Sequence, residues 1–366
     1  MKQGWEIKKI GEVFDLQMGK TPSRDNGDYW GGDNVWVAIS DLQDKYIGES
    51  KEHITDKALT ETKIKKVKAG TTIMSFKLSV GRAAITTQDL YTNEAIMAFN
   101  LNEGYDLIAD YIYYYLKGYK WQGANKAVMG LTLNKASMSQ NHIAIPPREE
   151  QERIVAELDC LSGVIEKKRE QLRELDALAQ SIFYQMFGDP ITNEKGWGVI
   201  PLKQAALLKA GKAIKANELS EDYDLGLYPC YGGNGIRGYI NKKSHNGQFP
   251  IIGRQGALCG NVVFAQGEFY ATEHAVVCNN IIESFNPLWL YYALKYNNLN
   301  RYAQGVAQPG ISVNIINEMP LIYPPLALQQ EFADKIEAIE KQKELIKKSI
   351  SETENLFNAR MDYYFN

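Results

Sequence analysis

Apolar residues recur at alternating steps of four and three along two segments of the chain, residues 148–187 and 326–365. This spacing is typical of a coiled-coil seam, which Lys168 interrupts in the first segment and Lys343 in the second. The seam is narrow and its flanks are charged, so we expect two long helices that pair antiparallel with each other. Two amphipathic helices packed on a domain core are the alternative interpretation. The residues expected to pair are Ile154, Leu158, Leu161, Ile165, Leu172, Leu175, Phe332, Ile336, Ile339, Ile346, Ile350 and Phe357.

Each heptad segment follows a Pro-Pro-x-x-x-Gln motif, and the rest of the chain repeats around these two motifs. The run "IPPREEQ" beginning at Ile145 matches "YPPLALQ" beginning at Tyr323, 178 residues later. Upstream, "GWEIKKIG" resembles "GWGVIPLK", and "YTNEAIMAF" resembles "YATEHAVV". Residues 22–69 and 213–248 show no such similarity. The chain is therefore predicted to be a duplicated scaffold that carries two different inserts.

Outside the heptad segments, short β-branched or aromatic runs alternate with Gly, Asn and Asp, which predicts strands joined by turns. The runs "LIADYIYYYLKGY" and "PLWLYYALKYNN" predict helices whose tyrosines pack in a core. The predicted fold class is α+β, with two globular domains joined by two long antiparallel helices in a pseudo-two-fold repeat. The domains are expected at residues 1–147 and 196–325. Residues 148–195 then form the central helix and linker, and residues 326–366 the C-terminal helix.

The net charge of −3 does not by itself favour a nucleic-acid partner, but the charge is unevenly distributed. Residues 1–147 carry 18 basic and 17 acidic side chains, and residues 196–325 carry 10 and 8, so both domains are slightly basic. A phosphate-binding face must therefore arise from local clusters.

No apolar run approaches the ~20 residues of a membrane span. The cysteines lack CxxC spacing, which favours reduced thiols and a cytoplasmic protein; they are Cys160, Cys230, Cys259 and Cys278.

Motifs for catalysis are missing from the sequence. The "GKT" at Gly19 lacks the first glycine of a phosphate-binding loop, and HExxH, GxSxG and zinc-type Cys/His clusters do not occur. The histidines are scattered along the chain, at His53, His142, His245 and His274. We therefore expect no catalytic residues and no metal site, and a protein that recognises a target and leaves chemistry to its partners.

Taken together, these motifs resemble the DNA specificity subunit of type I restriction–modification systems. The resemblance rests on "GWEIKKIGEVFDLQMGKTP", "IMSFKLSVGRAAI", "IAIPPREEQERIVAELD" and "FYQMFGDP", and on a weaker second set that includes "YPPLALQQEF" and "NARMDYYF". It covers essentially the whole chain. It implies two target recognition domains, each reading one half of a split site in double-stranded DNA. It also implies that the helices set the gap and dock two methyltransferase subunits, joined by restriction and translocase subunits.

The same resemblance implies that methyl transfer from S-adenosylmethionine belongs to the partner subunit, so no cofactor is expected in this chain. Candidate DNA-binding residues follow from their chemistry and their place in the repeat, since Arg and Lys suit phosphate or guanine and Gln suits adenine. In the first domain they are Lys20, Arg24, Ser75, Lys77, Ser79 and Arg82. In the second domain they are Lys212, Lys215, Arg237, Lys242, Lys243, Arg254 and Gln255. Each of these could instead be an ordinary solvated surface residue.

The heptad segments also bear on the geometry of the target. From Ile154 to Met186 a helix extends about 48 Å at ~1.5 Å per residue, and one turn of B-DNA is about 34 Å. Different inserts at the ends of such helices predict an asymmetric site with an unread spacer. Two alternatives remain open: a self-sufficient modification or restriction enzyme, and a coiled-coil assembly scaffold that does not recognise DNA.

Overall fold

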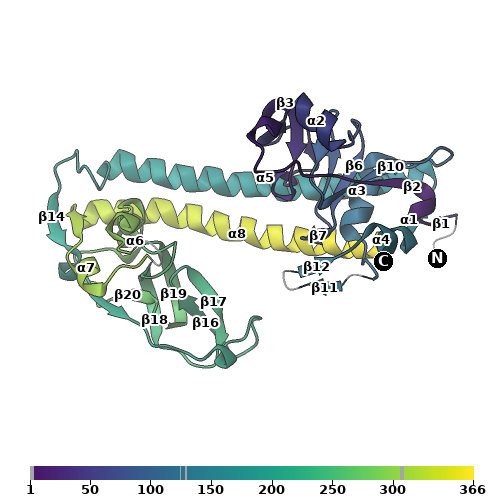
Figure 1. The fold of residues 1–366 in the computed structure, drawn as a ribbon. Helices are drawn as coiled ribbons and strands as arrows, with labels where there is room; N and C mark the ends of the chain where they lie inside the picture. Colours follow the sequence, from purple (N-terminus) through teal and green to yellow (C-terminus); the bar gives the residue numbers. More distant parts are fainter. Residues whose placement is uncertain (1–3, 124, 128–129, 306–308) are drawn as a thin grey trace. The chain divides into compact units, whose positions relative to one another are not determined.

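The computed structural model describes residues 4–123, 125–127, 130–305 and 309–366. The chain divides into two compact units, of which the first comprises Met1–Lys168 and Ser349–Asn366 and the second Arg169–Lys348. Each unit contains one β-rich domain, called here the first or second domain, and about half of each long helix (Figure 1). Among the described residues, no helix is long and apolar enough to cross a membrane.

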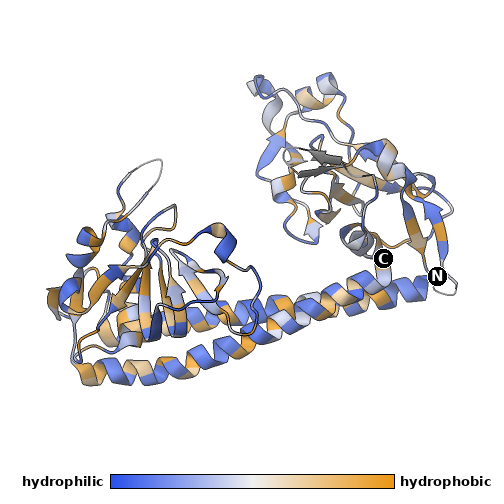
Figure 2. Cartoon of the chain, turned by 90° about the horizontal axis from the view of Figure 1, so that it is seen from below, coloured by the Kyte–Doolittle hydropathy of each residue, from blue (hydrophilic) through white to orange (hydrophobic). Residues whose placement is uncertain are grey.

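Two helices of 40 residues occupy the predicted heptad segments: α5 spans Arg148–Phe187 and α8 spans Leu326–Phe365. α5 ends where Gly188 adopts a φ of +75°, a conformation that favours glycine at the end of a helix. Apolar and polar residues alternate along both helices in Figure 2, as an amphipathic seam requires. The predicted helices are therefore confirmed.

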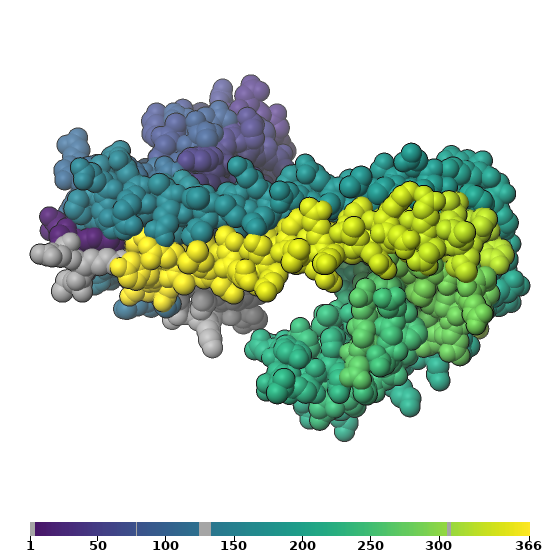
Figure 3. Space-filling model, turned by 180° about the vertical axis from the view of Figure 1, so that it is seen from behind, coloured from purple at the N-terminus to yellow at the C-terminus, as the bar shows by residue number. Residues whose placement is uncertain are grey.

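In the first unit the two helices run antiparallel. Glu157 of α5 accepts two hydrogen bonds from the guanidinium of Arg360 on α8. Further along α5, Lys168 donates to the hydroxyl of Ser349, which lies earlier on α8. Figures 1 and 3 show the two helices side by side. The predicted antiparallel pairing is confirmed.

The second unit continues this pairing through a lysine that stands at a seam position. Lys343 is 6% exposed, and its Nζ lies 2.8 Å from Oδ1 of Asp176 on α5 and 2.8 Å from Oε1 of Glu340 on its own helix. Burial opposes the charge of this lysine, but the two hydrogen bonds prevail and raise its pKa. The interruption of the seam at Lys343 is thus a polar contact between the helices.

The predicted seam residues are all buried or half-buried, but they do not all face the partner helix. Ile154 and Leu158 lie in the core of the first domain, and Phe332, Ile336 and Ile339 lie in the core of the second. The ends of the helices therefore close the domain cores, as the alternative interpretation predicts. The ends also keep the predicted pairing, since Phe332 of α8 packs against Phe183 and Phe187 of α5, while they supply the apolar cover that each sheet needs.

The first domain consists of small sheets and short helices. The larger sheet has the strand order β2-β10-β6-β8-β4, and smaller sheets join β5-β3-β9, β11-β12-β7 and β1-β13. Its elements are β1 (Glu6–Lys9), α1 (Ile10–Val13), β2 (Phe14–Met18), η1 (Gly27–Tyr29), β3 (Trp30–Val37), η2 (Ile39–Asp41), β4 (Tyr46–Ile47), β5 (Glu52–Ile54), α2 (Asp56–Thr62), β6 (Thr72–Ser75), β7 (Lys77–Leu78), β8 (Ala83–Thr86), β9 (Tyr91–Thr92), β10 (Ile96–Leu101), α3 (Ala109–Gly118), β11 (Asn125–Ala127), β12 (Gly130–Thr132), α4 (Lys135–Gln140) and β13 (His142–Ile145).

The second domain is built around one sheet with the strand order β15-β20-β18-β19-β16-β17, and β14 pairs separately with β21. Its elements are β14 (Gly198–Pro201), η3 (Leu202–Gln204), β15 (Leu207–Ala210), η4 (Ala216–Glu218), β16 (Tyr228–Gly232), β17 (Gly235–Ile240), β18 (His245–Gly253), β19 (Val262–Ala271), β20 (Ala275–Asn279), α6 (Pro287–Tyr296), η5 (Leu299–Tyr302), α7 (Val313–Asn317) and β21 (Pro320–Tyr323).

The internal repeat predicted from the sequence is visible in the topology. The order β2-β10-β6-β8 in the first domain corresponds to β15-β20-β18-β19 in the second. The tyrosine-rich helices α3 and α6 also correspond. Tyr114 of α3 donates a 2.5 Å hydrogen bond to Asp159 on α5, and Tyr292 of α6 donates one of 2.5 Å to Glu340 on α8. Both tyrosines are buried, as predicted.

The inserts are more alike in structure than in sequence. In the first domain β3 pairs parallel with β9, which sets Trp36 opposite Tyr91. In the second domain β16 pairs parallel with β19, which sets Cys230 opposite Tyr270. The inserts share this pairing even though the sequence shows no similarity between residues 22–69 and 213–248, because a parallel ladder constrains backbone geometry and leaves side chains free to vary.

The glutamine of each Pro-Pro-x-x-x-Gln motif joins a domain to its heptad helix. Gln151 is fully buried; its Nε2 donates to the carbonyls of Asp106 (2.7 Å) and Pro146 (3.0 Å), and its Oε1 accepts from the amide of Ile108, the N-cap of α3 (3.0 Å). Gln329 repeats this arrangement at the start of α6 with Ser284, Pro324 and Asn286. The motif thus satisfies buried backbone groups where a helix begins.

Candidate nucleic-acid interface

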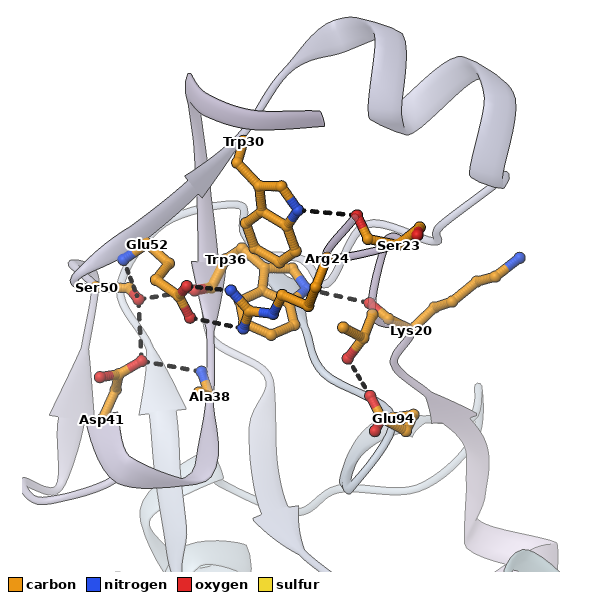
Figure 4. A network of polar contacts seen from close by, with 11 residues as sticks. Lys20, Ser23, Arg24, Trp30, Trp36, Ala38, Asp41, Ser50, Glu52 and Glu94 are labelled. Atoms are coloured by element: carbon orange, nitrogen blue, oxygen red, sulfur yellow. Dashed lines mark hydrogen bonds and ion pairs between the residues drawn. The ribbon is translucent and has the colours of Figure 1, made fainter. Parts of the chain in front are cut away.

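The first domain holds Arg24 between aromatic and acidic side chains (Figure 4). Its guanidinium lies 3.9 Å from the centre of the Trp30 ring and donates two hydrogen bonds to Glu52, one of them 2.9 Å long. The hydrogen bond between them raises the pKa of Arg24 and lowers that of Glu52. The charge of Arg24 is therefore already paired, and a DNA phosphate would have to displace Glu52 to bind it.

The same network fastens the segment around Arg24 to the insert. Trp36 Nε1 donates to the carbonyl of Lys20 (3.0 Å), and Trp30 Nε1 donates to the carbonyl of Ser23 (3.1 Å), as Figure 4 shows. The side chain of Lys20 is exposed, and its Nζ donates to the carbonyl of Thr62 (2.6 Å). Lys20 therefore carries an unneutralised charge at the surface, whereas Arg24 does not.

In the segment from the end of β6 to β8, the predicted DNA contacts differ in exposure: Arg82 is exposed, whereas Ser75 is buried. Ser75 is fully buried; its hydroxyl donates to the carbonyl of Ser79 and accepts from the amide of Arg82 (3.2 Å). The prediction that Ser75 contacts DNA is wrong, because the turn itself uses this hydroxyl. Arg82 is exposed, and its guanidinium has no partner among the described residues. Lys77 and Ser79 are half-buried.

The two Gly-Lys pairs singled out in the sequence occupy equivalent turns. A Cβ on Gly19 would lie 2.3 Å from the carbonyl oxygen of Thr92, and one on Gly211 would lie 2.0 Å from that of Ala271. Both glycines therefore let the turn after one strand approach the last residue of another, a packing role unrelated to nucleotide binding. Lys212, which follows the second glycine, is exposed.

Lysines of the second insert differ in whether a carboxylate already pairs with them. Lys242 Nζ lies 2.6 Å from Glu218, and Lys243 forms an ion pair with Glu268. Lys215, in contrast, is exposed and its ammonium has no partner among the described residues. An unpaired lysine attracts phosphate without first losing an internal contact, so Lys212 and Lys215 are better candidates than Lys242 and Lys243.

Three loops of the second domain meet around a cleft of about 530 Å³. Arg237, on β17, lines it together with Gln255 from the β18–β19 loop and His274 from the β19–β20 loop. Arg237 and Gln255 are exposed, and neither side chain has a partner among the described residues. The cleft thus brings together a free guanidinium, a carboxamide and an imidazole, groups that hydrogen-bond to the edges of purines.

Glycine makes the close packing of these loops possible. A Cβ on Gly253 would lie 1.9 Å from the carbonyl oxygen of Gly233, so the β16–β17 turn rests directly on the end of β18. Next to it, the backbone amide of Arg254 donates to the carbonyl of His274 (3.1 Å). The Arg254 side chain is half-buried. Arg254 is therefore the least accessible of the predicted cations in this domain.

Two residues near the cleft escaped the prediction from sequence. Asn234 lines the cleft and accepts a 2.6 Å hydrogen bond from Asn261, while His274 joins from a loop about 40 residues away. The motif "YGGNG" could have indicated Asn234, since glycines on both sides expose the side chain of a turn residue.

Among the described residues, no group of three His, Cys, Asp or Glu side chains is arranged to hold a metal ion.

The comparison with protein families agrees with the duplicated fold. A model of the type I restriction modification DNA specificity domain matches residues 2–176 and matches again at residues 194–355. The chain belongs to this family. It is a DNA specificity subunit and not a catalytic subunit of a type I system, and each half of the chain contains one copy of the domain.

Relatives of this specificity subunit extend over most of its length. The type I restriction enzyme EcoprrI specificity subunit of Escherichia coli is 30% identical over 339 residues, covering 87% of this chain and 84% of that protein. The MjaIX specificity subunit of Methanocaldococcus jannaschii is 24% identical over 390 residues, covering 92% and 86%. The crystal structure of an S subunit from M. genitalium shares the fold, with a TM-score of 0.60 at 16% identity, covering 98% of this chain and 95% of that one.

Proposed function

We propose that this specificity subunit reads a bipartite, asymmetric DNA site with one half assigned to each domain, and directs methyltransferase and restriction subunits to that site. The observation that supports the proposal is that the two domains share one backbone arrangement but differ in their exposed polar side chains. Both domains share the strand order of the larger sheet and the glutamine clamp, but their exposed, unpaired polar groups differ. The first domain offers Arg82, and the second offers the cleft of Arg237 and Gln255.

The helices support a fixed spacer between the half-sites. α5 and α8 each contain 40 residues, about 60 Å at ~1.5 Å per residue, and a turn of B-DNA is about 34 Å long. A continuous helix has few soft torsions, so its length would translate into a fixed number of unread base pairs. Unlike surfaces on the two domains favour unlike half-sites.

The partners follow from the role of a specificity subunit. Methyl transfer from S-adenosylmethionine would be the work of methyltransferase subunits, and this chain would hold no cofactor. A solved structure from a study of complex assembly and conformational transition of the type I R-M system shares this fold, with a TM-score of 0.57 at 16% identity. The likeness supports assembly only through the fold, so reconstitution with the partner subunits is needed to test it.

Sequencing of methylated DNA tests the bipartite reading. Replacing residues 1–147 by those of a relative should change one half of the methylated motif and leave the other half and the spacer unchanged. Replacing residues 196–325 should change only the other half. A continuous or palindromic motif would contradict the proposal, as would a domain replacement that alters both halves.

Deletion of one heptad tests the role of the helices. A deletion of residues 172–178 together with the antiparallel stretch 340–346 should shorten the accepted spacer or abolish methylation. It should not alter the bases in either half-site, since no candidate DNA-binding residue lies in either deleted stretch. An unchanged spacer in an active variant would show that the helices do not measure the gap. Strong methylation by the chain alone would favour the alternative of a self-sufficient enzyme.

A further inference from the structure

Lys45 links the first insert to two helices outside it. Its Nζ lies 2.6 Å from Oδ1 of Asp159 on α5 and 2.7 Å from Oδ1 of Asp110 on α3. The lysine side chain is 17% exposed, in contrast to the solvated lysines elsewhere on the insert. A part-buried ammonium that bridges two carboxylates from two other elements is a specific contact, because it holds two like charges close together.

Aromatic hydroxyl groups complete this contact. Tyr46 donates a 2.6 Å hydrogen bond to Asp110, and Tyr114 donates a 2.5 Å hydrogen bond to Asp159. The ammonium of Lys45 also lies 4.9 Å from the centre of the Tyr114 ring. Burial opposes the charge of Lys45, but the hydrogen bonds to both carboxylates prevail and raise its pKa. The lysine therefore remains charged throughout the physiological pH range.

The backbone at Lys45 is fixed as well. Its carbonyl accepts a 2.8 Å hydrogen bond from the amide of Ile85, where β4 begins to pair parallel with β8. Lys45 thus directly precedes a strand whose position is set by the sheet, and its side chain reaches α5 from there. The fixed backbone of Lys45 and its two ionic partners together define how the insert is oriented against α5.

The second unit has no equivalent of this contact. Lys242 and Lys243 of the second insert pair with Glu218 and Glu268 of their own domain. Among the described residues of the insert at 213–248, no side chain forms a hydrogen bond or ion pair with α5 or α8. Within the described part of the chain, the first insert alone is therefore tied to a heptad helix by a polar side chain.

We propose that Lys45 is a positioning residue that couples the DNA-reading insert of the first domain to α5 and so sets the phase of the first half-site along the duplex. This inference rests on the proposed bipartite function. The ammonium donates to Asp159 on α5, and its ion pair with Asp110 on α3 fixes the direction of the lysine side chain. Without the ammonium, the insert loses its ionic contact with α5, and the carboxylates of α3 and α5 are left without the cation between them.

The test measures spacer stringency in the reconstituted complex of this chain with its methyltransferase subunits. Duplexes carry both half-sites with the natural spacer or with one base pair more or fewer, and methylation of each is compared. For Lys45→Met, methylation at the altered spacers relative to the natural one should rise about tenfold, the factor lost with a charged hydrogen bond of roughly 1.4 kcal/mol. The bases required in each half-site should not change. Lys45→Arg should restore wild-type stringency, because a guanidinium can also bridge two carboxylates.

Lys57→Met provides a matched control on the same insert. Lys57 forms an ion pair of the same length, 2.6 Å, with Asp28, but both residues belong to the insert and both are exposed. Its removal should leave spacer stringency unchanged. A second variant, Asp159→Ala, keeps Lys45 paired with Asp110 and removes the contacts that Lys45 and Tyr114 make with α5. Tyr114→Phe removes the tyrosine's contact alone and serves as its control. Together they decide the question if Lys45→Met does not fold.

The outcomes separate this inference from the proposed function. If the wild-type complex requires both half-sites at one spacer, and Lys45→Met or Asp159→Ala keeps that stringency, the coupling is wrong and the bipartite reading stands. If the wild-type complex ignores the spacer or needs only one half-site, the proposed function itself fails. Relaxed stringency in Lys57→Met as well would overturn the specific role of Lys45.

Discussion

Whether a basic residue is free or already paired divides the candidate DNA contacts. Arg24 and Lys243 each form an ion pair with a carboxylate, so binding a phosphate would first break an internal contact. Arg82 and Arg237 are exposed, with no partner among the described residues. We therefore expect the free cations to contribute more to the affinity for DNA, and to its salt dependence, than the paired ones.

Arg237→Ala is expected to relax one base position in the half-site read by the second domain. Its guanidinium lines the cleft beside Gln255 and has the geometry to contact guanine, a contact worth about 1–3 kcal/mol of discrimination. Binding to a panel of duplexes with single base changes, assayed in the reconstituted complex, measures this effect. Lys243→Ala is the control, since Lys243 is paired with Glu268 and lies outside the cleft lining. A uniform loss across all duplexes with a smaller salt slope would mean that Arg237 binds phosphate.

Among the secondary-structure elements, the heptad helices have two different partners. Their ends lie in the domain cores, while their middle covers the other helix, with Ile165 at 8% exposure and Leu161 half-buried. A substitution in the middle of the helices therefore changes the free energy of unfolding mainly through helix pairing. The domain cores contribute little there, and a substitution in the middle tests the seam without disturbing either sheet.

Ile165→Asp is expected to lower the free energy of unfolding by more than about 3 kcal/mol, since a carboxylate would enter the seam without a partner. Leu178→Asp on the same helix is the control: Leu178 is 47% exposed, so its replacement should change stability by no more than about 0.5 kcal/mol. Thermal or denaturant unfolding of the full chain compares the two. Similar losses for both variants would show that burial in the seam is not what stabilises the pair.

At the scale of the whole molecule, one frame occurs twice and supports two unlike surfaces. The strand order of the larger sheets, the β1-β13 and β14-β21 ladders and the clamps of Gln151 and Gln329 recur, while the inserts differ in their free polar groups. This division separates the parts that hold the molecule together from the parts that we propose contact the target. It is consistent with membership in the type I DNA specificity family.

The purified chain alone is expected not to methylate DNA. Family membership makes it a specificity subunit, and the sequence contains no cofactor-binding motif that we recognise. Incubation with labelled S-adenosylmethionine and duplex DNA checks this, and addition of methyltransferase subunits provides the positive control. Incorporation of label before any subunit is added would contradict the assignment.

The sequence by itself determined the parts of this protein that depend on neighbours along the chain. The heptad spacing predicted α5 and α8, because a helix buries residues that recur every three to four positions. The duplicated motifs around Gln151 and Gln329 predicted the repeated frame. These features could be predicted because each depends on local backbone preference or on direct comparison of the two halves.

Only the tertiary structure decided which polar groups are available to a target. Arg24, in a loop, is paired with Glu52 of β5, and Lys45 reaches Asp159 on a distant helix. The parallel pairing shared by the inserts was equally invisible in the sequence. Each of these depends on contacts between residues far apart in the chain, where burial and the nearest opposite charge decide whether a side chain holds the fold or meets solvent.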